Sequence, residues 1–148
     1  AAFLSKVSNI IFIRNPEEII VSYSKVIPNP KLEDIGIEQQ YKLYLSLEKQ
    51  GYAPIVLDSK HLLKNPELML IKLCDILEIS FDRKMLKWEK GARKEDGVWA
   101  NHWYTNVHNS TGFLPYKEKE INLSVANSAL AKICKPYYEF LTDKSIQL

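Results

Sequence analysis

The segment from residue 8 to residue 26, SNIIFIRNPEEIIVSYSKV, limits the possible folds more than any other part of the chain. Residues 10 to 13 form a short apolar run with β-branched and aromatic side chains, which is typical of a central strand covered on both faces. The run ends at Arg14. The next four residues, NPEE, supply a capping asparagine, a proline suited to the first helical position and two acids that favour the positive end of a helix dipole. The segment therefore predicts a buried strand that passes directly into a helix.

Arg14 and Ser22 are the residues of this segment that can bind a ligand. Arg14 is expected at the carboxyl end of the strand, which is where open α/β sheets place their ligands. Ser22 follows eight residues later, at the edge of the apolar stripe of the helix, so the two side chains can hold one anionic group between them. The structural alternative is more common: Arg14 pairs with Glu17 or Glu18, and Ser22 is a solvated helix residue. The apolar stripe is predicted to consist of Ile19, Ile20, Tyr23, Val26 and Ile27.

The stretch IRNPEEIIVSYSK resembles the 3′-phosphate-binding segment of sulfotransferases that use 3′-phosphoadenosine 5′-phosphosulfate. In that family an arginine closes a strand, Asn or Asp and then Pro or a small residue follow, and a serine stands at the same spacing as Ser22. The resemblance implies that Arg14 and Ser22 bind the 3′-phosphate, which distinguishes the sulfate donor from ATP. It also implies an α/β fold like that of P-loop nucleotide hydrolases, in which helices flank both faces of a parallel sheet to give three layers.

A second strand is predicted at residues 53 to 58, APIVLD. Two helices precede it. The first ends at the proline-rich break PNPK, and the second runs from about residue 34 to residue 50, where Gly51 ends it. The order strand, helix, helix, strand predicts that the two strands pair in parallel within an α/β sheet. The inward residues of the second helix are expected to be Ile37, Tyr41, Tyr44, Leu45 and Leu47.

The residues after the second strand repeat the same cap. Asn65, Pro66 and Glu67 predict a helix that ends near residue 78, and a short helix is expected from residue 82 to residue 88. This region resembles the sulfotransferase sequence "Tyr-Glu-Asp-Leu" followed by "Asp-Pro" and a helix ending "Leu-Cys-x-Phe-Leu". Ser59 stands where the family has the tyrosine that packs against the adenine. The matching residues are Leu62, Leu63, Asn65, Pro66, Leu73, Cys74 and Leu77.

Residues 89 to 122 lack helical or strand periodicity and are predicted to form a long aromatic lid loop over a site, since their aromatic content argues against disorder. Sulfotransferases carry a late basic loop that closes on the 3′-phosphate. Arg93, Lys94, Gly97 and Trp99 resemble that loop, which implies that Arg93 and Lys94 also bind the phosphate. The pattern DGVW…HWY…STGF resembles a bacterial and plant branch of the family, some members of which are named after branched-chain aminotransferases.

A last amphipathic helix is predicted at residues 123 to 143.

Sulfuryl transfer needs cations on the sulfuryl oxygens and a base that takes the proton of the acceptor. His102 and His108, both in the aromatic loop, are the candidate bases; the alternative is that each fixes the loop through hydrogen bonds to the backbone. The resemblance places the phosphosulfate cradle, with its catalytic lysine, in a loop before residue 1, so the chain is expected to be the C-terminal part of the domain. A metal site is not expected, because no recognised zinc-ligand spacing is present.

Composition limits the class of partner. The 148 residues predict a single domain, and a net charge of +2 is too small to indicate nucleic-acid binding. No apolar run approaches the roughly 18 residues that a membrane-spanning helix needs. Cys74 and Cys134 occupy apolar positions of predicted helices and are expected to be packed thiols, which is typical of a reducing, cytoplasmic location. The oligomeric state is not predicted.

These features predict a sulfotransferase that transfers a sulfuryl group from 3′-phosphoadenosine 5′-phosphosulfate to a hydroxyl or amine of a small-molecule acceptor. One alternative is a non-catalytic nucleotide- or metabolite-binding module of the same fold. The other is a small-molecule kinase built on the same strand, loop and helix plan; turnover of ATP without a response to the sulfated donor would distinguish it.

Overall fold

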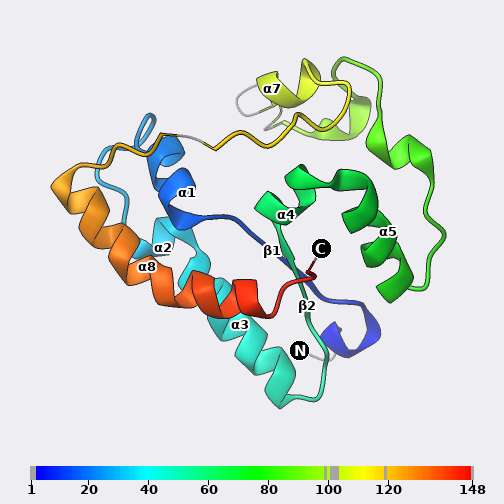
Figure 1. Ribbon diagram of the computed structural model, residues 1–148, viewed down its shortest axis with the longest axis horizontal. Helices are drawn as coiled ribbons and strands as arrows, with labels where there is room; N and C mark the ends of the chain where they lie inside the picture. Colours follow the sequence, from blue (N-terminus) through cyan, green and yellow to red (C-terminus); the bar gives the residue numbers. More distant parts are fainter. Residues whose placement is uncertain (1–2, 99, 101–103, 119, 148) are drawn as a thin grey trace.

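In the computed structural model, which describes residues 3–98, 100, 104–118 and 120–147, two short strands form a parallel sheet (Figure 1). β1 (Ile10–Ile13) pairs with β2 (Ile55–Asp58) residue by residue along the whole length of both strands. The predicted parallel pairing is confirmed. Because parallel strands run in the same direction, Arg14 and Ser59 follow them at the same edge of the sheet.

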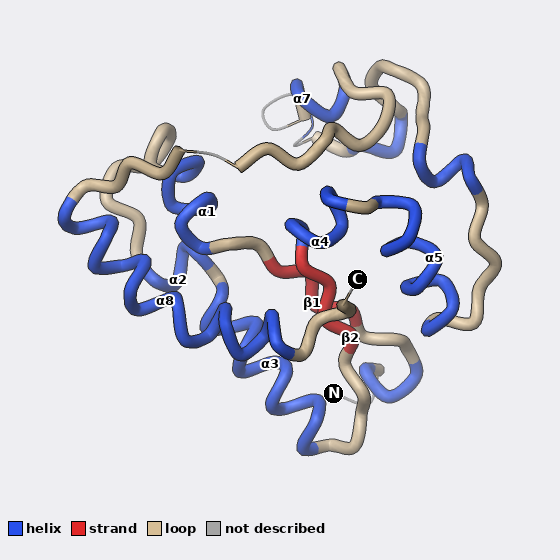
Figure 2. Tube along the Cα trace, in the orientation of Figure 1, coloured by secondary structure: helices blue, strands red, loops and turns tan. Residues whose placement is uncertain are grey.

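Helices connect and flank the strands (Figures 1 and 2). Within the described part of the chain, no helix combines the length and the apolar character that a bilayer crossing requires. In chain order, with short 3-10 helices labelled η, the helices are η1 (Leu4–Lys6), α1 (Pro16–Tyr23), α2 (Leu32–Ile35), α3 (Ile37–Lys49), α4 (Ser59–Lys64), α5 (Pro66–Ile76), η2 (Arg83–Leu86), η3 (Lys94–Asp96), α7 (Thr105–His108) and α8 (Val125–Asp143).

Both predicted asparagine caps are confirmed. Asn15 Oδ1 accepts the backbone N–H of Glu17 at 2.9 Å at the start of α1, and Asn65 Oδ1 accepts that of Leu68 at 3.2 Å at the start of α5. In each case a proline follows the cap at the first helical position, where its missing N–H leaves no bond unmade. The cap at Asn15 makes α1 begin immediately after β1 and so fixes the direction in which the helix leaves the strand.

The helical region between the strands is shorter and more divided than predicted. α1 ends before Val26 and Ile27, which are exposed, so the prediction that they continue its apolar stripe is wrong. The helix predicted from residue 34 to residue 50 is divided at Gly36, whose φ of 78° is a conformation that favours glycine. Gly51, also at φ 78°, follows the end of α3 as predicted.

The main hydrophobic core lies on one face of the sheet, between the strands and helices α1, α2, α3 and α8. Burial of this apolar surface holds the helices on the sheet. Cys134 belongs to the core, and both Cys74 and Cys134 are free, buried thiols, as predicted. The buried members are Ile11, Ile13, Ile20, Ile35, Ile37, Tyr44, Leu47, Val56, Ala131, Cys134 and Leu141.

The opposite face of the sheet is covered only in part. Leu57 of β2 packs with Leu62 of α4 and Met69 of α5, whereas Ile10 and Phe12 of β1 are 43% and 52% exposed. The prediction that the first strand is covered on both faces is wrong within the described residues, because α4 and α5 follow β2 and pack against that strand. The α/β class is confirmed as a small parallel sheet with helices, and the larger three-layer, P-loop-like arrangement stays a prediction.

The last helix, α8, lies close to its predicted bounds of 123 to 143 and packs against the strands, α1 and α3. Leu141 of this helix is buried, whereas Val125 and Ile133 are 90% and 54% exposed and point away from the core. After α8 the chain returns to the sheet, where the N–H of Ile146 donates to the carbonyl of Val56 at 2.9 Å. β2 therefore lies between β1 and the C-terminal residues.

A fully buried carboxylate ends β2. Asp58 Oδ2 accepts hydrogen bonds from the hydroxyls of Tyr138 at 2.7 Å and Thr142 at 3.3 Å, both on α8. Its Oδ1 accepts the backbone N–H of Lys60 at 2.8 Å and so caps α4. Burial, together with the bond to Asp58, raises the pKa of Tyr138, so its hydroxyl remains a donor. Asp58 thus connects the strand, the helix that follows it and the last helix.

The segment from residue 89 to residue 122 contains two short helices, η3 and α7, in its described part. Trp88 anchors the segment at its start: the indole Nε1 donates to Ser110 Oγ at 2.9 Å, and the ring meets that of Phe113 edge-on with centroids 5.4 Å apart. Phe113 also packs against the smaller core beneath α4 and α5. The segment is therefore packed against the domain through Ser110 and Phe113. Its role as a lid stays a prediction.

Asp96 links the two short helices. Its Oδ2 accepts the backbone N–H of Arg93 at 2.7 Å, before η3, and lies 2.9 Å from Nε2 of His108 at the end of α7. These contacts, that of Arg93 first, lower the pKa of Asp96 below its usual value. The carboxylate therefore stabilises this turn at pH values above the pKa that Asp96 has in the unfolded chain. The stabilisation is lost as the pH falls through the lower pKa of Asp96 in the folded protein.

We expect Asp58→Ala to lower the free energy of unfolding by about 3 kcal/mol, because two hydroxyls and a helix cap lose their acceptor inside the protein. Asp58→Asn, which keeps one acceptor oxygen, should lose about half as much. Urea denaturation measures both values. The control is Asp75→Ala, at an exposed position of α5. A loss for Asp58→Ala no larger than that of the control would show that the carboxylate does not hold α8.

Asp96→Ala should make the backbone after Arg93 and Lys94 easier to cleave, because the turn loses the carboxylate that joins η3 to α7. Limited trypsin digestion of the native protein, followed by mass spectrometry, measures the rate at these two bonds. We expect an increase of severalfold, since cleavage requires local opening. Glu95→Ala, which removes the neighbouring exposed acid, is the control, and equal rates in the two variants contradict the prediction.

Candidate functional site

Arg14 and Ser22 line one surface hollow of about 180 Å³ at the carboxyl end of β1. Arg14 is the first residue after the strand, and Ser22 lies on α1, which begins at once after it. The short connection therefore brings both side chains to the same hollow. The structure brings together two of the four residues predicted to bind a phosphate. The other lining residues are Ile19, Tyr23 and Val26.

Arg14 makes a salt bridge to an acid of α1. Its Nε donates to Glu18 Oε2 at 3.0 Å, and the two side chains are 38% and 11% exposed. This is the pairing that the structural alternative expected. Among the described residues, however, the structure records no partner for the two terminal nitrogens of the guanidinium. Since a guanidinium carries five N–H donors, Arg14 can keep Glu18 and still bind an anion in the hollow.

Tyr116 forms a cluster with Arg14 and Glu18, and it belongs to residues 89 to 122, which are called the late segment from here on. Its hydroxyl donates to Glu18 Oε1 at 3.3 Å. The Nζ atoms of Lys60 and Lys64, on α4, lie 5.6 and 5.8 Å from the centroid of its ring, within the range of a cation–π contact. Burial, and next the charge of Glu18, raise the pKa of Tyr116, so the hydroxyl is protonated at neutral pH. The cluster thus joins α1, α4 and the late segment.

No pattern in the sequence indicates the role of Tyr116 in this cluster. A single tyrosine in a segment without periodicity has no pattern that indicates its contact, and the sequence predicts for Glu18 only a helix-dipole acid and one possible partner of Arg14. The two lysines of α4 stand four positions apart, and this spacing is enough to place them on one face of a helix. What they face could be learned only from the structure.

Arg93 and Lys94 are exposed at η3. The described residues record no contact between them and Arg14 or Ser22, and neither lines the hollow. Figure 1 shows α7, to which Asp96 links η3, apart from α1. Their predicted part in binding the phosphate therefore stays a prediction.

His108 is held by the carboxylate of Asp96, and its ring meets that of Tyr104 edge-on with centroids 5.9 Å apart. This geometry favours the interpretation that His108 fixes the loop, although its partner is a carboxylate and not the backbone. His102, the other candidate base, lies outside the described residues, as do Trp99 and Trp103. Within the described part of the chain, no three histidines, cysteines or acids gather as a metal site would require.

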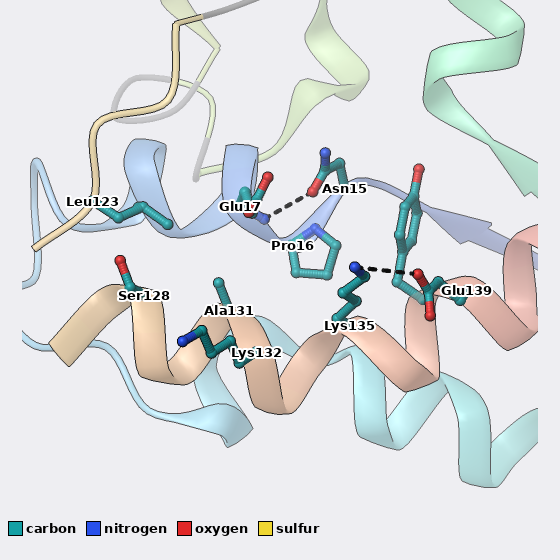
Figure 3. A pocket seen from close by; sticks show the side chains of 10 residues that line it. Asn15, Pro16, Glu17, Leu123, Ser128, Ala131, Lys132, Lys135 and Glu139 are labelled. Carbon is teal, nitrogen blue, oxygen red and sulfur yellow. Dashed lines mark hydrogen bonds and ion pairs between the residues drawn. The ribbon is translucent and has the colours of Figure 1, made fainter. Parts of the chain in front are cut away.

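A larger hollow of about 500 Å³ lies between the start of α1 and α8 (Figure 3). Lys132 and Lys135 reach it from α8, and Glu17 and Glu139 line it as well, with Lys135 Nζ 3.6 Å from Glu139 Oε1. The opposite charges nearly balance, so the hollow favours neither an anion nor a cation. Sequence patterns did not indicate it, because its charged residues on α8 have the composition of an ordinary solvated helix face.

Comparison with known proteins identifies relatives over nearly the whole chain. The model of the sulfotransferase domain family matches residues 3–145. The Arabidopsis thaliana protein named "Branched-chain-amino-acid aminotransferase-like protein 1" is 39% identical over 138 residues, which is 93% of this chain and 25% of that protein. "Branched-chain-amino-acid aminotransferase-like protein 2", from the same plant, is 36% identical over 138 residues, 93% of this chain and 24% of the relative.

The chain therefore spans about a quarter of the length of these two relatives. No solved structure matches it. The matched residues include both strands, the hollow at Arg14 and the late segment with Tyr116. The resemblance seen in the sequence is thus confirmed at the level of the family, and the chain belongs to the sulfotransferase domain family.

Proposed function

We propose that this chain is the donor-recognising part of a sulfotransferase that transfers a sulfuryl group from 3′-phosphoadenosine 5′-phosphosulfate to a hydroxyl or amine of a small-molecule acceptor. The observation that carries the proposal is the hollow shared by Arg14 and Ser22 at the carboxyl end of β1, in a chain of the sulfotransferase domain family. Open α/β sheets bind their ligands at this edge.

The two side chains have the chemistry that a phosphate monoester requires. The terminal nitrogens of Arg14 form a planar fork that matches two phosphate oxygens, and the hydroxyl of Ser22 can donate to a third. The hollow is open to solvent, which suits a group that does not react but must be exchanged at every turnover. In this proposal Arg14 and Ser22 bind the 3′-phosphate, the group that separates the donor from ATP.

The contribution of these residues to catalysis is positioning. Sulfuryl transfer is an in-line displacement, so the donor must be held in one orientation relative to the acceptor. Fixing the 3′-phosphate fixes the far end of the nucleotide. His108, held by Asp96, helps to shape the late segment, and the base that takes the acceptor's proton is not assigned among the described residues.

Arg14→Ala should remove the preference for a 3′-phosphate. We expect the affinity for adenosine 3′,5′-bisphosphate, relative to adenosine 5′-monophosphate, to fall by about 10- to 100-fold, because charge-assisted hydrogen bonds are lost. Arg14→Lys should retain part of the preference, since it keeps the charge without the fork. Isothermal titration calorimetry on the longest natural protein that contains this chain measures both ligands.

The matched control is Arg83→Ala, which removes an exposed arginine of η2 that pairs with Glu67. It should leave the ratio of affinities unchanged. Equal binding of the two nucleotides by the unmodified protein, or an unchanged ratio in Arg14→Ala, contradicts the proposal. Binding of ATP in preference to both ligands would favour a kinase.

Ser22→Ala should weaken the binding of adenosine 3′,5′-bisphosphate by about 3- to 10-fold and leave adenosine 5′-monophosphate unaffected, because one hydrogen bond to the 3′-phosphate is lost. The fold should be unchanged, since Ser22 is exposed on α1. Ser46→Ala, at an exposed position of α3, is the control. The same loss for both nucleotides would show that Ser22 does not contact the 3′-phosphate.

A further inference from the structure

We propose that Glu18 and Tyr116 are positioning residues for Arg14. The late segment then sets the geometry of the 3′-phosphate clamp, the name used here for the pair Arg14 and Ser22. The inference takes its ligand, the 3′-phosphate, from the proposed function. The contacts among the three residues are observed in the structure and do not depend on that function. It gives the late segment a role at the donor site that does not depend on Arg93 or Lys94.

Glu18 uses both of its oxygens, each for one neighbour. Oε2 accepts from Arg14 Nε at 3.0 Å, and Oε1 accepts from the hydroxyl of Tyr116 at 3.3 Å. The side chain is only 11% exposed, so few other orientations are open to it. The carboxylate therefore transmits the position of Tyr116 to the guanidinium.

Glu18 binds Arg14 at Nε, and this determines which N–H donors of the guanidinium remain for a ligand. A guanidinium is planar, so fixing Nε fixes the plane that also contains the two terminal nitrogens. Those nitrogens carry the four other N–H donors, and Arg14 lines the hollow together with Ser22. An arginine held at Nε presents its fork in one orientation, whereas a free arginine must be ordered when the anion binds.

Tyr116 is itself held by the helix that follows the second strand. Lys60 and Lys64 lie over its ring from α4, which begins directly after β2. Lys60 Nζ also lies 3.9 Å from Glu118 Oε1, two residues further along the late segment. The raised pKa of Tyr116 keeps its hydroxyl a donor at neutral pH. The position of Arg14, after β1, is thus linked through Tyr116 to the helix that follows β2.

The negative charge of Glu18 also opposes an anion in the hollow, so its removal has two opposite effects. Glu17 separates them: it precedes Glu18 on α1, is exposed, and makes no recorded side-chain contact with Arg14 among the described residues. If charge alone mattered, Glu17→Gln and Glu18→Gln would both strengthen binding. Positioning predicts that Glu18→Gln weakens it while Glu17→Gln does not.

The test compares Glu18→Gln and Tyr116→Phe with the controls Glu17→Gln and Tyr104→Phe in the longest natural protein that contains this chain. Tyr104 lies in the same late segment, but its ring contacts His108. The readout is the affinity for adenosine 3′,5′-bisphosphate relative to adenosine 5′-monophosphate. We expect this ratio to fall by about 5- to 20-fold in Glu18→Gln and by about 2- to 5-fold in Tyr116→Phe, with both controls unchanged.

The double variant tests whether the two residues act as one unit. Tyr116 acts only through Glu18, so Glu18→Gln combined with Tyr116→Phe should lose no more than Glu18→Gln alone. Additive losses would mean that Tyr116 affects the nucleotide by another route, and the linkage would be overturned. Unchanged ratios in both single variants overturn it as well.

A second readout needs no nucleotide. In the free protein the Nε–H of Arg14, bonded to Glu18, should exchange slowly with solvent in NMR spectra, and Glu18→Gln and Tyr116→Phe should both accelerate the exchange. If the unmodified protein binds the two nucleotides equally, the proposed function fails and this exchange alone decides the positioning. Unchanged exchange in both variants overturns the positioning even where the Arg14→Ala result supports the clamp.

Discussion

The buried carboxylate at the end of β2 is the interaction on which the arrangement of the last helix depends. Asp58 is fully buried, and its partners are the hydroxyls of Tyr138 and Thr142 and the backbone N–H of Lys60. Buried carboxyl oxygens need hydrogen-bond donors, so α8 must present these two hydroxyls, four positions apart, to the strand. That requirement fixes the rotation of α8 about its axis. It also explains why Cys134, on the same face as Tyr138, is buried while its neighbour Ile133 is exposed.

Parallel pairing has a similar consequence at the carboxyl edge of the sheet. α1 and α4 each begin within a few residues of a strand end, so Glu18 on one helix and Lys60 on the other lie at the same edge. Tyr116 makes contacts with both, through its hydroxyl to Glu18 and its ring to the lysines. Leu114, two positions earlier, is 76% exposed. At Tyr116 the late segment is therefore held by contacts to charged groups, whereas three residues earlier Phe113 holds it by packing against apolar side chains.

The parts of the site that depend on neighbouring residues could be predicted from the sequence, and the parts that depend on distant ones could not. Asn15 caps α1 within one turn, so its signal is local, and the same cap places Arg14 at the strand end. The contact of Tyr116 with Glu18 joins residues 98 positions apart and has no local pattern. The exposure of Phe12 has the same cause, because a strand covered on one face by distant helices can have the composition of one covered on both.

The two interpretations of Arg14 that the sequence left open are compatible once the atoms are considered. The structural interpretation requires a pairing with an acid of α1, and Nε makes that bond to Glu18. The functional interpretation requires N–H donors beside Ser22. Arg14 lines the hollow together with Ser22, and its terminal nitrogens supply such donors. A lysine would serve less well, because its three donors radiate from one nitrogen and cannot offer a phosphate the planar fork of two nitrogens. In the proposed clamp the salt bridge thus takes no terminal nitrogen from the anion and holds the plane in which the fork lies, while the negative charge of Glu18 opposes the anion.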